Sequence, residues 1–346
     1  EVCGSHTMAI ARYGIRDLLP ASVDLVSGPG CPVCVTDAGY LDTALVMARQ
    51  GALVVTFGDL LNVPSSTLTL GQARAEGARI EVCYSPAEAL EWARRTPDRE
   101  VVFLAIGFET TIGPVISLVD AARATGVRNL SLLTAFKRIP PALALLRADP
   151  ELKINAFLCP AHVSAIIGAQ AYAFLAGPGG IPCVIAGFEP LDILIGIDHI
   201  LRQILAGTAR VENLYDRVVR ETGNTRIQAL IARILTPAAA AWRGLGVLPD
   251  SGLALRPDFA DFDAPAKLKI PLQTAAPPTA CRCGEVIKGQ LHPPQCPLFG
   301  AGCTPDHPIG PCMVSAEGSC AAAYKYSRLT PPAPARRSTN HQQASK

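Results

Sequence analysis

The sequence predicts an α/β protein in which two lobes built on parallel sheets precede a small, loop-rich C-terminal iron–sulfur domain. The composition is 49% hydrophobic and 17% charged, as expected for buried parallel strands covered by helices. Apolar, β-branched runs alternate with helical patterns from residue 24 to about residue 205, an order typical of parallel sheets with right-handed crossovers. Beyond residue 280, cysteines concentrate in a region rich in proline and glycine that lacks either periodicity.

The length of 346 residues allows two domains, or three small ones, each with its own core. We expect a first α/β lobe over residues 1–85 and a second over residues 86–210. Residues 211–330 are expected to hold a helical segment and the iron–sulfur domain. The Pro-, Ser- and Gln-bearing end, residues 331–346, predicts a disordered tail.

In the first part of the chain, apolar runs bounded by turn residues predict the strands. The run ALVVTF is β-branched and ends in Gly58-Asp59, which places the Asp59 carboxylate at the carboxyl end of a buried strand. Ser85 is expected to cap the helix that starts at Pro86. The expected elements are strands at 24–28, 52–57 and 80–84 and helices at 38–50 and 86–95.

The tripeptide Gly-Phe-Glu follows a predicted strand twice, and both times it precedes a helix. This junction places Glu109 and Glu189 where open α/β sheets bind ligands. His162 lies at another strand-to-helix turn, where a lone histidine is more often a hydrogen-bonded structural residue. The expected strands are 101–106, 130–135, 156–158 and 184–186. Helices are expected from near residue 114, after residue 141, from about residue 160 to 174 and over 191–205. Helices are also expected to dominate residues 211–242. Residues 264–280 are expected to be a connector.

Cysteines after residue 280 predict a metal centre. Four thiolates in a short run without regular structure suit a cubane iron–sulfur cluster or a tetrahedral zinc. Six residues separate Cys296 from Cys303 and sixteen separate Cys303 from Cys320, whereas zinc ligands usually pair at about two to four residues, so the cluster is favoured over zinc, disulfides or free thiols. The predicted ligands are Cys296, Cys303, Cys320 and one of Cys281 and Cys283. Cys312, which follows a proline in a turn, is the expected bystander.

Two motifs near the start of the chain carry further thiols. Cys3 and His6 flank a Gly-Ser step, which fits an exposed thiolate with a lowered pKa or, with a slight preference, a buried small residue. Cys31 and Cys34 form a C-x-x-C behind a Gly-Pro-Gly turn and ahead of a helical pattern, a setting typical of dithiol redox sites. Half of a zinc site is the alternative. Cys83 and Cys183, which lie inside apolar strands, are expected to be core residues.

Several classes of function are disfavoured. The formal net charge is +2 without a concentrated Lys/Arg face, which argues against nucleic acid as a partner. The most apolar stretch, 181–200, is interrupted by prolines and carboxylates, so no membrane span is expected. Patterns for dinucleotide or P-loop sites are missing from the sequence. Twelve cysteines without an export signal indicate a reducing compartment, the cytoplasm.

With these residues in view, the chain resembles the HypD family, accessory proteins that help assemble the iron centre of [NiFe]-hydrogenases. The similarity extends from residue 1 to about residue 328. Family members usually have some tens of residues before the first matching block, so this chain resembles a member without its N-terminal helical segment. The matching blocks are EVCGSHTMAI, GPGCPVC, FGDLLNVPSS, GFETT, CPAHVSAIIG, GFEPLD, CRCGEVIKG and CPLFGAGCTPDHPIGPCMVSAEGSCAAAYKY.

The resemblance implies a scaffold for the Fe(CN)2CO fragment, more than a conventional enzyme, that works with the small chaperone HypC and receives cyanide from HypE. Cys3 would hold the iron jointly with a cysteine of HypC, with His6 close by. Cys31 and Cys34 would form the redox-active dithiol, and the C-terminal cysteines would bind a [4Fe–4S] cluster. A role in lining the cleft or in hydrogen bonding is implied for further motif residues, namely Asp59, Glu109, His162, Glu189 and Glu317.

One motif departs from the family, because Met8 stands where a second histidine often follows the first cysteine. Two other functions stay open at this stage. One is a free-standing iron–sulfur or thiol oxidoreductase that uses Cys31 and Cys34 as its catalytic pair. The other is a zinc-stabilised binding module without redox chemistry.

Overall fold

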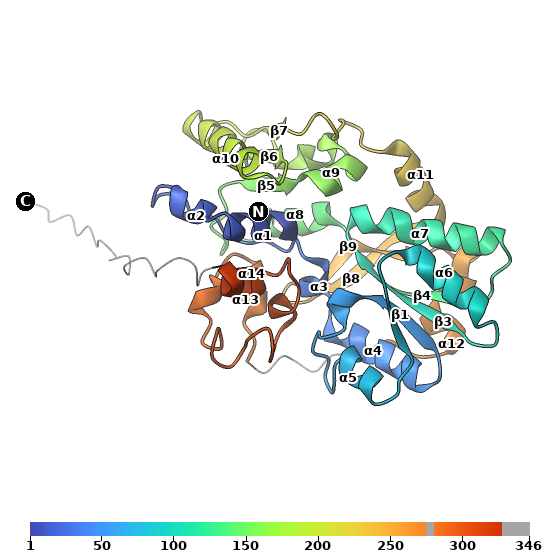
Figure 1. Ribbon diagram of the computed structural model, residues 1–346. Helices are drawn as coiled ribbons and strands as arrows, with labels where there is room; N and C mark the ends of the chain where they lie inside the picture. Colours follow the sequence, from blue (N-terminus) through green and yellow to red (C-terminus); the bar gives the residue numbers. More distant parts are fainter. Residues whose placement is uncertain (275–279, 327–346) are drawn as a thin grey trace, which may run out of the picture.

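The computed structural model describes residues 1–274 and 280–326, and its largest element is a six-stranded mixed sheet (Figure 1). The order across this sheet is β2-β1-β3-β4-β9-β8. The first four strands are parallel, and β9 and β8 continue the sheet antiparallel. Their bounds are β1 Leu53–Phe57, β2 Ile80–Cys83, β3 Val101–Gly107, β4 Leu130–Lys137, β8 Leu235–Trp242 and β9 Gly246–Leu255.

The central strands are buried on both faces. All seven residues of β3 are buried, and alternate residues enter different cores: Val102 and Leu104 pack in one cluster, Val101 and Phe103 in the other. Side chains of a strand point alternately to its two faces, so an uninterrupted apolar run indicates a strand covered on both sides. The prediction of buried parallel strands from such runs is therefore confirmed for β1, β3 and β4.

A second, smaller sheet has the order β5-β6-β7 and is parallel throughout. A third apolar cluster joins this sheet to α1, α2 and α10 through Ile10, Ile15 and Ile193. In Figure 1 this sheet and α10 lie together, away from β1 and β2. The bounds are β5 Phe157–Pro160, β6 Cys183–Ala186 and β7 Val211–Asn213.

Helices connect the strands and cover the sheets. Ser85 caps α6 in a capping box with Glu88, as predicted. The α-helices are α1 Gly4–Arg12, α2 Ile15–Leu18, α3 Pro32–Val35, α4 Ala38–Arg49, α5 Leu70–Ala75, α6 Pro86–Arg95, α7 Glu109–Ala124, α8 Ile139–Ala148, α9 Ala161–Ile167, α10 Pro190–Leu205, α11 Thr225–Ile234, α12 Ala264–Leu268, α13 Cys283–Ile287 and α14 Ser319–Tyr326. Short 3₁₀ segments are η1 Gly58–Leu60, η2 Ala169–Leu175, η3 Pro257–Phe262, η4 Pro293–Gln295 and η5 Pro311–Met313.

The main sheet crosses the lobe boundary expected between residues 85 and 86. β1 and β2 lie before it, β3 and β4 lie after it, and all four belong to one sheet. β8 and β9, from the segment expected to be mainly helical, extend the same sheet. Sequence order could not show this, because strand pairing over long separations leaves no local pattern.

The helix expected to dominate residues 211–242 is limited to α11. Residues 235–242 form β8, although their four consecutive alanines have high helix propensity. Antiparallel pairing with β9 overrides that preference, and Pro237 is tolerated because β8 is the edge strand.

Smaller differences concern element ends. Residues 24–28 do not form a strand in the structure. The helix expected near Pro114 already begins at Glu109 and contains that proline. The helix expected to reach residue 174 ends at Ile167, because Gly168 has a φ of +86° before η2 begins. The predicted connector contains α12, and the predicted tail lies outside the described residues.

Residues 280–326 form the loop-rich C-terminal region, with two short α-helices and two 3₁₀ turns. α14 packs against α1, and η5 contacts α3, so this region lies beside the start of the chain (Figure 1). Throughout residues 1–274 and 280–326, every helix is too short or too polar to cross a lipid bilayer.

Candidate functional site: a junction of cysteine-bearing segments

The first residues of the chain lie against the loop that carries Cys31. The amide of Gly4 donates a hydrogen bond of 3.1 Å to the carbonyl of Gly30, and the amide of Gly28 donates one of 2.7 Å to the carbonyl of Glu1. A Cβ on Gly30 would overlap the backbone at Cys3, so glycine is required for this approach. Cys3 therefore lies beside the residue that immediately precedes Cys31.

The C-terminal region closes the junction from another side through Glu317. The Ser5 hydroxyl donates a hydrogen bond of 2.7 Å to Oε1 of Glu317. A Cβ on Gly4 would overlap the Glu317 side chain, so the two segments are in close contact. Glu317 thus brings a carboxylate next to the first turn of α1.

Cys3 caps the N-terminus of α1 and is partly exposed. Burial of its sulfur and the negative charge of Glu317 raise the pKa of Cys3 to about 11, and backbone interactions at His6 and Ser5 oppose this only in part. Of the two alternatives for Cys3, the less favoured one, an exposed thiolate with a lowered pKa, does not agree with this environment. A cation at the sulfur would reverse the balance by stabilising the thiolate.

His6 is fully buried and neutral. Its Nε2 donates a hydrogen bond of 2.8 Å to the carbonyl of Gly187, because a carbonyl can only accept. Its Nδ1 is a buried acceptor without a partner among the described residues. Burial lowers the pKa of His6 to about 4. An imidazole held in this way adds no positive charge beside Cys3.

Phe188 joins His6 to His162. The Phe188 ring lies 4.7 Å from the His6 ring and 4.1 Å from the exposed His162 ring, measured between centroids. Burial lowers the pKa of His162, and the charge of Glu317 opposes that shift. Phe188 follows β6 and His162 follows β5, so the carboxyl ends of neighbouring parallel strands deliver these rings, as is usual for ligand sites in α/β sheets.

Cys31 and Cys34 form a disulfide across α3, with Cα atoms 5.2 Å apart. Cys31 is the N-cap of this helix, and its sulfur accepts a hydrogen bond of 3.2 Å from the Cys34 amide. Both residues are at most 5% exposed. Pro32 at the first helical position sets the tight turn that brings the two sulfurs together.

Cysteines of the C-terminal region line one small, mostly apolar cavity. Phe299, Met313 and Leu298 supply part of its wall. The cysteines around it are Cys281, Cys283, Cys296, Cys303, Cys312 and Cys320. The five named as candidate ligands are therefore brought together, and Cys312, the expected bystander, lies among them.

Interactions among these thiols distinguish Cys283 from the others. A hydrogen-bond interaction with Cys281 lowers the pKa of the Cys283 thiol. An interaction with Cys312 and burial raise it, and the resulting pKa of Cys283 is about 12. The interaction with Cys283 and burial raise the pKa of Cys281. Burial, followed by the charges of Cys281, Cys283, Cys303 and Cys296, raises the pKa of Cys320. Neutral thiols are therefore favoured until a cation compensates their charge.

Arg243 links the cysteine cavity to α3. Its backbone amide donates to the carbonyl of Val35 at 2.8 Å, and its Nε donates to the carbonyl of Thr36 at 3.1 Å. Its charge lowers the pKa of both Cys281 and Cys283. Because α3 also contacts η5, where Cys312 lies, the disulfide and the C-terminal thiols are neighbours.

The cysteine set can be compared with the requirements of an iron–sulfur cluster. Among residues 1–274 and 280–326, no three His, Cys, Asp or Glu side chains are arranged to hold one metal ion. A [4Fe–4S] cluster is ligated at separate iron atoms, so its thiolates surround a volume and need not converge on one point. Thiols around an apolar cavity, in a segment of loops and short helices, match that requirement in type and number.

Three other predicted residues, Asp59, Glu109 and Glu189, do not line the cysteine cavity. Asp59 is exposed in η1 and does not line the cysteine cavity. Glu109 is 5% exposed, and its Oε1 accepts a hydrogen bond of 3.0 Å from the Ile139 amide, which ties α7 to α8. Burial raises the pKa of Glu109 to about 7. Glu189, in the second Gly-Phe-Glu tripeptide, is exposed. The two Gly-Phe-Glu turns are therefore not structurally equivalent.

Sequence reasoning missed Phe188 and Arg243 and understated Cys312. The aromatic residue lies inside a motif that was noticed for its glutamate. Arg243 lies next to the segment that was expected to be mainly helical. A single arginine there forms no motif that would indicate a functional site. For Cys312, the one available indication was its position in the sequence between the predicted ligands Cys303 and Cys320.

The fold and site together define an α/β protein that gathers an N-terminal cysteine, a C-x-x-C disulfide and a cysteine-rich C-terminal region at one junction. Residues 1–327 match the family model described as HypD, hydrogenase formation hypA family. The chain belongs to the HypD family.

Named relatives are similar over almost the whole chain. The hydrogenase maturation factor HypD of Azotobacter vinelandii is 47% identical over 336 residues, which cover 95% of this chain and 89% of the relative. HypD of Escherichia coli strain K12 is 43% identical over 328 residues, covering 94% and 88%. A putative hydrogenase expression/formation protein of Methanocaldococcus jannaschii is 40% identical over 329 residues, covering 95% and 92%.

Proposed function

We propose that this protein is the scaffold on which the Fe(CN)2CO fragment of [NiFe]-hydrogenase is assembled. Its membership of a family of hydrogenase maturation factors supports this role. A HypC-type chaperone would share the iron, and a HypE-type protein would deliver cyanide. The reducing environment indicated by twelve cysteines supports a cytoplasmic location.

The single observation that carries the proposal is the packing of Cys3 against Gly30, the residue before the disulfide. It places Cys3, a residue of intermediate exposure, close to a redox-capable pair, where a partner protein could reach a bound iron. Soft thiolate donors suit low-spin iron that carries cyanide and CO, and they permit later transfer by ligand exchange. Because the pKa of Cys3 is about 11, iron binding would release its proton.

His6 and His162 would shape the iron site without charging it. The imidazoles of His6 and His162, on either side of Phe188, are neutral and would add no positive charge near Cys3. Glu317 would position the first turn of α1 through Ser5.

Cys31 and Cys34 would serve as a two-electron store. Reduction of their disulfide takes up two electrons and two protons and yields two thiols; the reverse reaction returns the two electrons to a partner. The observed disulfide is the oxidised member of that couple.

The C-terminal cysteines would hold the [4Fe–4S] cluster. We assign Cys281, Cys296, Cys303 and Cys320 as ligands, because Cys283 also interacts with Cys312 and so has an alternative thiol partner. When bound, the cluster would supply single-electron redox capacity next to α3.

A free-standing thiol oxidoreductase is the second candidate, because the Cys31–Cys34 disulfide would suit it equally. Infrared spectroscopy of the anaerobically purified complex with HypC separates the two. The scaffold predicts stretching bands of iron-bound cyanide and CO; an oxidoreductase predicts none and no stable complex. Absorption of the same sample tests the cluster, since a broad band near ~400 nm is expected for a thiolate-bound cluster and a colourless, zinc-loaded chain would exclude it.

A further inference from the structure

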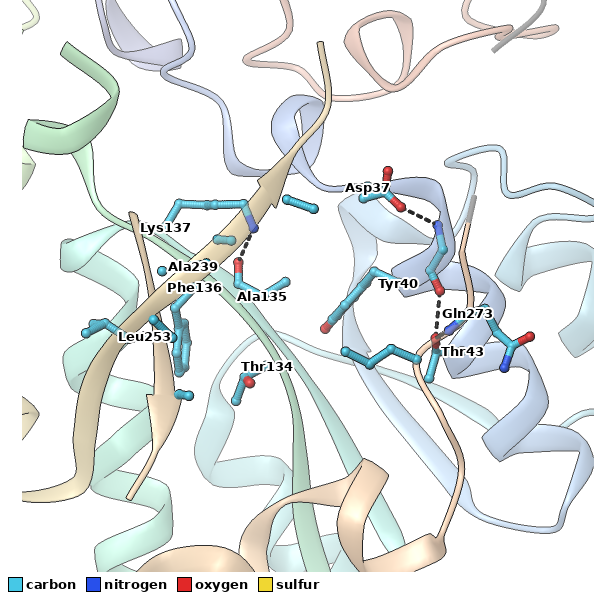
Figure 2. Close-up of a pocket in the computed structure, with 17 residues that line it drawn as sticks. Asp37, Tyr40, Thr43, Thr134, Ala135, Phe136, Lys137, Ala239, Leu253 and Gln273 are labelled. Atoms are coloured by element: carbon cyan, nitrogen blue, oxygen red, sulfur yellow. Dashed lines mark hydrogen bonds between the residues drawn. The ribbon is translucent and has the colours of Figure 1, made fainter. Parts of the chain in front are cut away.

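A second cavity lies away from the cysteines, between β4, the start of α4 and the β8–β9 hairpin (Figure 2). Its volume is about 280 Å³. One wall consists of small residues of the hairpin, Ala238 to Ala241 and Gly252, and the opposite wall contains Tyr40 and Thr43 of α4. Because the hairpin side chains are small, space remains between elements that otherwise pack closely.

Lys137, the last residue of β4, lines this cavity with a buried amine. It is only 3% exposed, and its Nζ lies 3.4 Å from the carbonyl of Ala135 and 5.9 Å from the centroid of the Trp242 ring. No ion pair of Lys137 occurs among the described residues. An ammonium has three donors, so this one long hydrogen bond leaves a buried cation without an anionic acceptor.

Three other polar side chains of the cavity, those of Tyr40, Asp37 and Thr43, already have hydrogen-bond partners. The Tyr40 hydroxyl donates to the carbonyl of Leu133 at 2.8 Å, and Oδ2 of Asp37 accepts from the Gly39 amide at 2.9 Å. The Thr43 hydroxyl donates to the carbonyl of Gly39 and accepts from the Gln273 amide. Figure 2 shows Asp37 and Lys137 on opposite sides of the cavity. Lys137 is therefore the group that a ligand would satisfy.

The charges nearby favour a ligand with one negative charge. Burial lowers the pKa of Lys137 to about 8, and the negative charge of Asp37 opposes that shift. The Asp37 carboxylate is therefore close enough to influence the charge of Lys137. The Lys137 ammonium can compensate one negative charge, whereas the Asp37 carboxylate would repel a second, which disfavours a dianion. Phe136 and Leu253 offer apolar contact for a short carbon skeleton. The volume lies just below the ~300 Å³ at which pockets for larger ligands begin.

We propose that this cavity binds a small monocarboxylate whose carboxylate accepts hydrogen bonds from the Lys137 ammonium. The site is separate from the cysteine junction, and the proposal does not depend on iron assembly. A bound carboxylate would supply the buried cation with a charge-assisted hydrogen bond, which is stronger than a neutral one.

Calorimetric titration of the full chain, purified anaerobically, tests the proposal with acetate, propanoate and lactate as probes. Acetamide is the uncharged isostere of acetate, and inorganic phosphate is the competing oxyanion. We expect saturable binding of at least one carboxylate, with acetamide and phosphate each weaker by about tenfold or more, as expected for loss of a charged hydrogen bond.

Two variants localise the binding. Lys137→Met removes the charge and should weaken carboxylate binding at least about tenfold. Ala238 lines the cavity, so Ala238→Leu should reduce binding by filling it. Lys153→Met changes an exposed lysine and is the matched control, which should leave binding unchanged.

Circular dichroism of each variant checks that it is folded. If Lys137→Met does not fold, the effect of Ala238→Leu on carboxylate binding shows whether the ligand occupies this cavity. The proposal would be overturned if all three carboxylates fail to bind or if phosphate binds more tightly than any carboxylate. It would also be overturned if a carboxylate that binds the wild type binds the folded Lys137→Met variant equally well.

Discussion

The amide of Gly4 donates a 3.1 Å hydrogen bond to the carbonyl of Gly30, and this contact places Cys3 beside the C-x-x-C loop. A side chain at residue 30 would overlap the backbone at Cys3. The relative positions of the first thiol and the disulfide therefore depend on a glycine that carries no chemistry of its own.

Gly30→Ala should destabilise the protein by about 1–3 kcal/mol, because the added methyl group forces the two backbone segments apart. Gly58→Ala is the matched control, since a Cβ there would lie 3.6 Å from Val82, an ordinary contact. Urea denaturation of both variants gives the two free energies. Equal stability of the two variants would mean that the junction tolerates separation of its segments.

Glu317→Gln should lower the pKa of Cys3 from about 11 while leaving it above its ordinary value. Burial is the larger cause of the raised pKa and remains, whereas the charge of Glu317 is removed. The amide oxygen can still accept from Ser5, so the contact between the segments is retained. The pH dependence of Cys3 alkylation, followed by peptide mass spectrometry, measures this shift. An unchanged profile would show that Glu317 does not influence the thiol.

Lys137→Met should stabilise the ligand-free protein at pH 7. The folded-state pKa of about 8 lies below the ordinary lysine pKa of 10.5, so the folded state disfavours the charged amine, at a cost on the order of 3 kcal/mol. The cost is fully present below pH 8 and disappears as the pH rises to about 10.5, because the unfolded chain binds the additional proton in that range. Denaturation curves at pH 7 and pH 10 should show a difference that shrinks at the higher pH; a constant difference would contradict this account.

Glu109→Gln should be more stabilising at pH 8 than at pH 5. Burial raises the pKa of Glu109 to about 7, so a proton is retained in the folded state between about pH 4.5 and 7, and wild-type stability falls with pH over that range. Above pH 7 the buried charge costs on the order of 3 kcal/mol, which the amide avoids while it keeps the bond from Ile139. Thermal unfolding at the two pH values measures the effect, and identical shifts at both would refute it.

The strands of the parallel sheets were predictable because their signal is local. β3 is a continuous apolar run and β1 and β4 are mostly apolar, and runs of that kind need cover on both faces. β8 was not predictable, since its alanines favour a helix and only pairing with β9 makes it a strand. The same long-range pairing explains why the main sheet crosses the expected lobe boundary.

The cysteines of the site could be named from the sequence, but their surroundings could not. Spacing and family resemblance indicated Cys3, Cys31 and Cys34. Neither showed that Glu317 raises the pKa of Cys3 or that Phe188 lies between two histidines, because these contacts join residues far apart in the chain. Sequence motifs named the candidate thiols, and their packing determines how easily they lose a proton.

The central claim is that Cys3 holds the iron fragment at this junction. Infrared spectra of the complex with HypC, purified anaerobically from cells that express Cys3→Ala, test it most directly, with Cys83→Ala, a change at a buried core thiol, as the matched control. We expect the cyanide and CO bands to be lost in Cys3→Ala, which still folds, and kept in Cys83→Ala. Bands of wild-type intensity in the Cys3→Ala complex would contradict the account.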